Sequence, residues 1–191
     1  MINKTFFSKL KRDFEFYEKH RRIIIRNSND ALQKSKQAIF SLHRDDYKEA
    51  DRLLKTVEKI FKNLENIFKK KEFLRYEGAY KASIEEYVEA KLFYKYLKTG
   101  KVSEIKEVKV GFNGYLGGLS DLTGELSRKA TFFATKGNFK EVEKIKNAID
   151  DIMKELIKLN LTGYLRTKYD QAKNSMKRME SVMYDIKIRR R

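Results

Sequence analysis

The chain has 191 residues, with 44 Lys and Arg against 27 Asp and Glu, a formal net charge of +17, and neither cysteine nor proline. The lack of cysteine excludes disulfides, zinc thiolate sites and thiol catalysis, and the lack of proline lets long helices run without a ring clash. The positive charge favours an anionic partner, which could be RNA, DNA or anionic lipid, although lysine-rich solvated helix faces would explain it equally well.

The hydrophobic runs of the chain are short. The longest purely aliphatic run, Ile23 to Ile25, is far below the ~20 residues that span a bilayer. The N-terminus lacks the apolar region of a signal peptide. No repeat, low-complexity stretch or linker divides the sequence. We therefore expect a soluble cytoplasmic protein with no membrane partner, folded as a single domain over residues 1–191.

The first half of the sequence predicts three helices. A very long first helix ends near His43, with one apolar face made of Leu10, Phe14, Tyr17, Ile24, Ala31, Ala38 and Leu42. Asp46 and Glu49 have the spacing of a capping box, so a second helix begins there. Its broad apolar stripe, from Leu53 to Phe68, suits a buried bundle helix. A third helix is predicted from about Phe73 to Leu97.

The second half predicts three more helices. Periodicity lapses between Thr99 and Gly111, which indicates an irregular connection before a fourth helix capped by Asn113. Gly137 and Asn138 supply a turn and a new cap, and a fifth helix reaches about Leu159. The last helix carries an apolar stripe made of Leu165, Tyr169, Ala172, Met176, Met179, Met183 and Ile186. The prediction is an all-α bundle of about six to seven long helices, with these aromatic and Met stripes in the core.

Two pairs of acids stand out against the basic composition. Glu86 and Glu89 are three residues apart, and Asp121 and Glu125 are four apart, so each pair lies on one helix face. A core stripe through Leu119, Leu122 and Leu126 places Asp121 and Glu125 beside the core. A lone buried carboxylate is costly, so such acids imply a paired base, a proton or a metal. Acids at this spacing are also common on solvated faces, as we expect for Asp150, Asp151 and Glu155.

The ligand types narrow the choice of metal. Oxygen ligands without His or Cys suit Mg²⁺ or Mn²⁺ better than zinc or copper. The chain has only two histidines and no Glu-x-x-His pair, which excludes a ferritin-like di-iron site. Mg²⁺ held by carboxylates supports phosphodiester hydrolysis. Five of the nine glycines fall between Gly111 and Gly124, which indicates close approach of a backbone, a subunit or a phosphate, or simply tight helix packing.

Four segments resemble one known family. They are "SKQAIFSLHR" from Ser35, "EEYVEA" from Glu85, "DLTGE" from Asp121 and "VMYDIKIRR" from Val182. Together they resemble the translin superfamily, and its Trax branch more than translin itself. In this resemblance Glu86 and Glu89 fall on the two catalytic glutamates of Trax, and Asp121 and Glu125 fall on its catalytic aspartate and glutamate. Gly114 departs from the pattern, because the family usually has an aspartate there.

The resemblance implies a subunit of a hollow octamer in which RNA is cut by a Mg²⁺-dependent endoribonuclease, with Mn²⁺ as a possible substitute. Glu86, Glu89 and Asp121 would hold the metal, and Glu125 would be a ligand or orient the attacking water. We expect a homo-octamer acting on single-stranded or partly unpaired RNA, with a translin-like partner subunit not excluded. A non-catalytic RNA- or DNA-binding assembly is the alternative, and a structural scaffold that binds polyanions is a third interpretation.

Several other residues are candidates for RNA contact. Arg128 lies one turn beyond Glu125 and could bind the scissile phosphate or pair with Glu125, and Lys129 is a weaker candidate of the same kind. Tyr87 and Tyr115 could stack on unpaired bases, although core packing is the more common role of such residues. The tail made of Arg189, Arg190 and Arg191 could touch RNA or be a solvated end.

Overall fold

The computed structural model describes residues 3–189, which form six α-helices, one 3₁₀-helix and no strand. This confirms the predicted all-α fold. The helices are α1 (Lys4–His43), α2 (Tyr47–Phe68), η1 (Glu72–Tyr76), α3 (Gly78–Thr99), α4 (Phe112–Thr135), α5 (Phe139–Leu156) and α6 (Gly163–Arg189). Within the described residues, none of these helices combines the length and the apolar character needed to cross a membrane.

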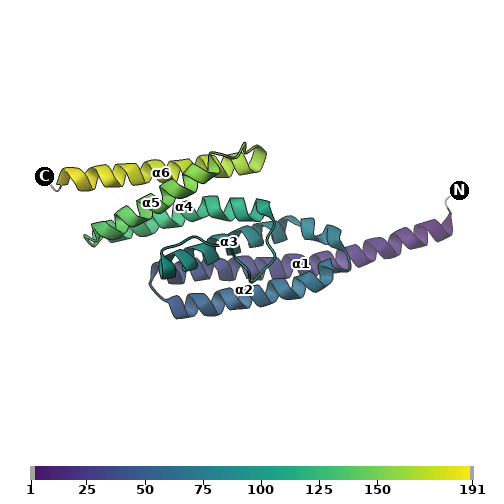
Figure 1. The fold of residues 1–191 in the computed structure, drawn as a ribbon. Helices are drawn as coiled ribbons and strands as arrows, with labels where there is room; N and C mark the ends of the chain where they lie inside the picture. The colour runs from purple at the N-terminus through teal and green to yellow at the C-terminus, as the bar shows by residue number, and fades with distance from the viewer. Residues whose placement is uncertain (1–2, 190–191) are drawn as a thin grey trace.

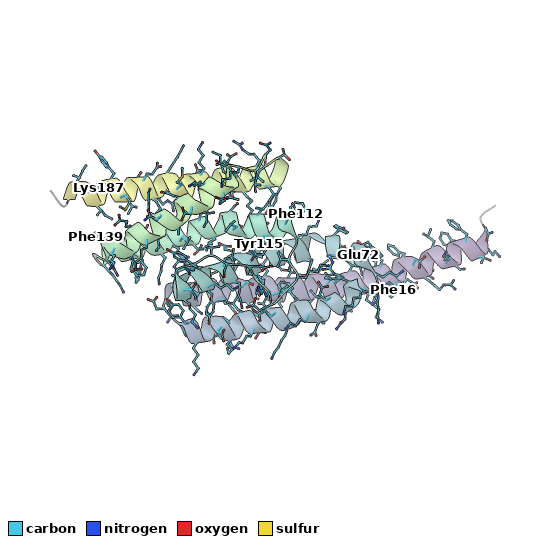
Figure 2. All side chains as sticks on the ribbon, in the orientation of Figure 1. Phe16, Glu72, Phe112, Tyr115, Phe139 and Lys187 are labelled. Atoms are coloured by element: carbon cyan, nitrogen blue, oxygen red, sulfur yellow. The ribbon has the colours of Figure 1, made fainter. Side chains whose placement is uncertain are left out.

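The helices stack in a chain of neighbours. α1 packs against α2 and α3, α3 packs against α4, and α4 packs against both α5 and α6. The start of α1 extends past the rest of the bundle, as Figure 1 shows at the N-terminal end. In the side-chain view, Phe112 and Tyr115 mark the beginning of α4, and Lys187 marks the end of α6 (Figure 2). Helices α3 and α4 therefore lie in the middle of the stack.

Several helix boundaries follow the predicted caps. The Asp46 side chain accepts a hydrogen bond from the Glu49 amide at 3.0 Å, as expected for the start of α2. The Asn138 side chain accepts one from Glu141 at the start of α5. Gly137 has φ +70°, the left-handed conformation that glycine adopts most readily. These local signals placed three helix ends correctly.

Other boundaries differ from the prediction. The predicted third helix is split, because Glu77 adopts an extended backbone (ψ 131°) between η1 and α3. Helix α4 begins two residues earlier than expected, with Gly111 at the cap and no capping side chain, so Asn113 is not the cap. Helix α5 ends at Leu156, before the predicted Leu159, in a turn that leads to Gly163 at φ +53°.

The core runs along the facing sides of the helices. The apolar face of α1 is buried at Ile24, Ala31, Ala38 and Leu42. Leu10 and Phe14, which the same spacing assigned to that face, are 51% and 62% exposed because this part of α1 has no helix beside it. In the last helix Ala172, Met179 and Ile186 are buried, as the predicted stripe requires. The core therefore runs through the helix stack but does not include the part of α1 around Leu10 and Phe14.

Candidate active site

Helix α3 carries the first pair of acids on a face covered by its neighbours. Glu89 is buried, with 9% of its surface exposed, and Glu86 one turn earlier is half-buried. Helices α1 and α4 both pack against α3. Carboxylates in such a position lose much of their hydration, which is unfavourable for the charged form.

Helix α4 carries the second pair at the edge of the core. The side chains of Asp121 and Glu125 are each 22% exposed, while Leu122 and Leu126 beside them are fully buried. This is the arrangement that the core stripe of α4 predicted. The two acids are therefore positioned by the residues that anchor α4 in the bundle.

The two pairs act on each other electrostatically. Burial, together with the charges of Glu86, Asp121 and Glu125, raises the pKa of Glu89 to about 9. Burial also raises the pKa of Glu86, with Asp121 and Glu125 contributing and Lys36 of α1 opposing. The carboxylates of α3 and α4 thus share one negatively charged region, although they are more than thirty residues apart in the sequence.

A lysine from α6 reaches this region. Lys168 Nζ lies 2.5 Å from Asp121 Oδ2 and 2.6 Å from Glu85 Oε1. The Tyr164 hydroxyl donates a hydrogen bond to the same Glu85 oxygen at 2.5 Å. Burial alone would lower the pKa of Lys168, but hydrogen bonds from its ammonium to Asp121 and Glu85 outweigh burial and raise it. Burial likewise raises the pKa of Asp121 although the ammonium acts in the opposite direction.

Glu125 has two basic neighbours of its own. His43, the last residue of α1, contacts Glu125 Oε2 through its Nε2 atom. Arg128 Nη1 lies 3.6 Å from the same oxygen, and its side chain is 57% exposed. Of the two roles considered for Arg128, the structure therefore contains the pairing with Glu125. Contact with an RNA phosphate stays a prediction.

Glycines in α4 allow the close approach of α3. A Cβ atom at Gly117 would lie 2.2 Å from Oε2 of Glu85, and one at Gly118 would lie 2.7 Å from the Glu85 backbone oxygen. Gly114 faces Ile84, whose Cγ2 atom would be 2.7 Å from an added Cβ. The acid that the family usually has at position 114 would therefore collide with α3 here. Tight helix packing accounts for these three glycines.

The side chains, as they stand, are not arranged as a coordination sphere. Within residues 3–189, no group of three or more His, Asp and Glu side chains is positioned to hold one metal ion. Asp121 is engaged by Lys168, and Glu125 by His43 and Arg128. These contacts use Oδ2 of Asp121 and Oε2 of Glu125, which is one oxygen of each carboxylate.

Lys129, which we expected to contact RNA, lies inside the bundle. It is fully buried, and its ammonium donates to the backbone oxygens of Leu42 and His43 at 3.2 Å and to Asp45 at 2.7 Å. Cations stabilise the C-terminal end of a helix, where carbonyl groups lack partners. Lys129 thus stabilises the end of α1, and this position speaks against its predicted contact with RNA.

The two tyrosines also serve the packing. Tyr87 is fully buried, packs edge-on against Phe61 and donates a hydrogen bond to Glu58 at 3.0 Å. The Tyr115 hydroxyl accepts a hydrogen bond from the Ile105 amide at 2.5 Å and so holds the loop before α4. Tyr87 therefore has no face available for base stacking, whereas Tyr115 is only partly buried and its stacking on RNA stays a prediction. The tail made of Arg189, Arg190 and Arg191 falls outside the side chains that the structure describes.

Sequence reasoning missed three residues at the site, namely His43, Glu85 and Lys168. Glu85 lies next to Glu86 in the sequence, but its carboxylate points toward α6, where Tyr164 and Lys168 meet it. The four-residue spacing of Tyr164 and Lys168 puts them on one face of α6. That spacing was the available signal, but it identifies no partner without the packing of α6 against α4.

Comparisons with known proteins agree with this architecture. Translin of Gallus gallus is 36% identical over 76 residues, which cover 39% of this chain and 33% of that protein, so the match spans about a third of the curated relative. The crystal structure of apo-NeC3PO has 26% identity and a TM-score of 0.85, covering 96% of this chain and 97% of that one.

A second solved structure has the same fold. It is that of an AfC3PO–duplex RNA complex, with 22% identity and a TM-score of 0.87 over 96% of this chain and 97% of that one. The model of the Translin family matches residues 19–190. The described helices lie within that range except for the first fifteen residues of α1. The chain therefore belongs to the Translin family.

Proposed function

We propose that this chain is a Trax-like, metal-dependent endoribonuclease that cleaves single-stranded or partly unpaired RNA inside an oligomeric shell. The observation that carries the proposal is the cluster formed by Glu86, Glu89, Asp121 and Glu125. These four carboxylates come from two facing helices, and their burial and mutual repulsion raise the pKa of Glu89 to about 9. A packed bundle has no structural need for such a concentration of acid, which lowers stability.

The donor chemistry of the cluster fits a hard divalent cation. All four side chains offer carboxylate oxygens, which Mg²⁺ and Mn²⁺ prefer. A cation would offset the repulsion that raises the pKa values of Glu86 and Glu89. Glu86, Glu89 and Asp121 are the residues that would hold it, with Glu125 as a further ligand or as the orienter of the attacking water. When bound, the cation would supply Lewis-acid activation of water and of the phosphoryl group.

Residues of the chain itself would orient the attacking water and bind the phosphate. The Glu125 carboxylate can accept a hydrogen bond from a water molecule and aim it at the phosphorus atom, with His43 fixing its orientation. Arg128, at 57% side-chain exposure, can turn from Glu125 to a phosphate oxygen. The net charge of +17 would draw RNA toward the assembly. A homo-octamer is the assembly we propose, and a second, translin-like subunit is compatible with this proposal.

A non-catalytic nucleic-acid-binding assembly is the second candidate function. It is favoured by the match to Translin of Gallus gallus. The two candidates differ in what they require of the acids, since a binder does not need four carboxylates beside its nucleic acid. They also differ in how they respond to metal.

The test is cleavage of a labelled single-stranded RNA by the purified protein, with Mg²⁺, Mn²⁺ or EDTA, and with a duplex RNA alongside. Glu89→Gln is the informative variant and Glu143→Gln, an exposed acid on α5, is its matched control. All proteins are compared at the same oligomeric size. Cutting that needs the metal and Glu89 but not Glu143 supports the nuclease. RNA that is bound but left intact with every metal supports the binding assembly.

A further inference from the structure

Lys168 is held beside the acid cluster by side chains from α3 and α4. Its ammonium bridges Asp121 on α4 and Glu85 on α3, and the Tyr164 hydroxyl one turn earlier on α6 binds the same Glu85 oxygen. α6 lies along α4 in Figure 1. The Lys168 and Glu85 side chains are only 16% and 12% exposed, so this is an interior pair rather than a surface one.

The packing of α3 on α4 makes room for this pair. The Glu85 carboxylate occupies the place where a side chain at position 117 would begin, with only 2.2 Å between an added Cβ and Oε2. Glu85 therefore needs a glycine at position 117 to reach Lys168. Burying an ion pair is rarely worthwhile for stability alone, because the desolvation of both groups offsets their attraction. Lys168 also contacts Asp121, which indicates that the ion pair has a role at the acid cluster.

We propose that Lys168 is a positioning residue for the metal site: held by Glu85 and Tyr164, it fixes the Asp121 carboxylate through Oδ2 so that Oδ1 faces the cation. This inference rests on the proposed metal-dependent function and deepens it. A partner that orients a ligand is a common feature of metal sites, and its removal typically costs about 10–100-fold in metal affinity. Lys168 is not itself a ligand, since an ammonium group has no lone pair to give.

A purely electrostatic role for Lys168 predicts the opposite change in cation affinity. If Lys168 acted only through its charge, it would repel a divalent cation, and Lys168→Met would bind the cation more tightly. If it occupied the metal's place, its loss would also tighten binding. Only positioning of Asp121 predicts weaker binding when the positive charge is removed. The direction of the change therefore decides between the accounts.

The experiment measures Mn²⁺ affinity by the loss of the free-ion EPR signal, on full-length protein without RNA. The main variant is Lys168→Met, and the double substitution Glu85→Gln with Lys168→Met accompanies it because it removes both charges of the pair and leaves the net charge unchanged. Lys173→Met, an exposed lysine on the same helix, is the control for Lys168→Met alone. Tyr164→Phe removes one hydroxyl from a residue that is 61% exposed, so it tests the same network with little risk to folding.

We expect Lys168→Met and the double variant to bind Mn²⁺ about tenfold or more weakly, Tyr164→Phe to weaken binding in the same direction by less, and Lys173→Met to bind like wild type. RNA affinity in EDTA should not change in any of them. Unchanged or tighter Mn²⁺ binding in Lys168→Met, with normal wild-type binding, overturns the role of Lys168 and leaves the nuclease proposal intact. Wild-type protein that binds no Mn²⁺ at its acids overturns both.

Discussion

Glu85 of α3 and Gly117 of α4 are in such close contact that a methyl group at position 117 would overlap the Glu85 carboxylate, with Oε2 only 2.2 Å from the new Cβ. The carboxylate fills the space that any other residue would need. At the next residue, Gly118, an added Cβ would lie 2.7 Å from the Glu85 backbone oxygen and from Val88 Cβ, so this glycine allows the close approach of α3 and α4.

Gly117→Ala should destabilise the protein, because Glu85 must move away from Lys168 or the helices must separate. Overpacking of this kind costs about 1–3 kcal/mol. Gly124→Ala in the same helix is the matched control, since its nearest neighbour would be Ser175 Oγ at 3.9 Å. There alanine should be neutral or stabilise the helix by up to ~1 kcal/mol. Urea unfolding monitored by circular dichroism compares them, and equal effects would refute the contact.

Glu89→Gln should stabilise the protein in EDTA. The folded-state pKa of Glu89, about 9, is above its ordinary value of 4.5, so the folded state holds a proton that the unfolded state releases. Ionisation therefore lowers stability progressively as the pH rises from about 4.5 to about 9. The gain from Glu89→Gln should be near zero at acid pH and reach about 2–3 kcal/mol near neutral pH.

Thermal or urea unfolding of Glu89→Gln and wild type across this pH range checks the sign. Glu143→Gln, at an exposed position on α5, should have no such dependence. A Glu89→Gln variant that is less stable than wild type at every pH would contradict the account of Glu89 as a strained, buried acid.

Arg75→Gln should lower stability near neutral pH. Arg75 of η1 binds Glu65 of α2 through both ends of its guanidinium group, at 2.5 and 2.8 Å, and lies over the Phe68 ring. The hydrogen bond to Arg75 holds the pKa of Glu65 below its ordinary value. This contribution is present above the unfolded pKa and is lost as the pH falls through the folded one, so the effect, about 1 kcal/mol, should shrink in acid.

The exposed pair Arg52 and Glu49 provides the comparison for Arg75. It also has two hydrogen bonds, but the Arg52 side chain is 66% exposed. Arg52→Gln should change stability much less than Arg75→Gln, because solvent screens the exposed pair. Stability curves of both variants against pH would show whether burial separates them, and identical curves would argue against the prediction.

Lys129→Met should destabilise the bundle without weakening RNA binding by the folded protein. It leaves the Leu42 and His43 carbonyls and Asp45 without their buried ammonium, which costs about 2–3 kcal/mol. Arg128→Gln should behave in the opposite way, with nearly wild-type stability and weaker RNA binding or cleavage. Fluorescence anisotropy with labelled RNA and urea unfolding measure the two properties. If Lys129→Met keeps full stability but binds RNA more weakly, Lys129 contacts RNA as the sequence first suggested.

Much of the fold is predictable from sequence because local signals determine helices. The capping spacing of Asp46 and Glu49, the left-handed Gly137 and the apolar periodicities all correspond to observed features. The split between η1 and α3 was missed because nothing in the local pattern marks Glu77 as extended. The exposure of Leu10 and Phe14 was missed because periodicity identifies an apolar face but not whether a partner covers it.

From the sequence, the candidate site could be predicted only as two pairs of acids, each pair within one helix. Spacing marked Glu86 and Glu89 on α3, and Asp121 and Glu125 on α4, as pairs on one helix face, and the family resemblance selected them from other acids at similar spacing. The contacts that control them come from elsewhere, with His43 on α1 and Lys168 on α6. Such contacts depend on how the helices pack, which residue spacing within one helix does not encode. For the same reason Lys129 was a candidate for RNA contact from its sequence position, although its side chain is buried.

The most direct test of the central claim is the rate at which wild type and Glu89→Gln cut one labelled single-stranded RNA in Mg²⁺, with RNA affinity measured in EDTA. The account predicts equal affinity and a loss of cutting on the order of a hundredfold or more in the variant. Equal cutting by both proteins, or no cutting by wild type with either Mg²⁺ or Mn²⁺ although RNA is bound, would contradict it.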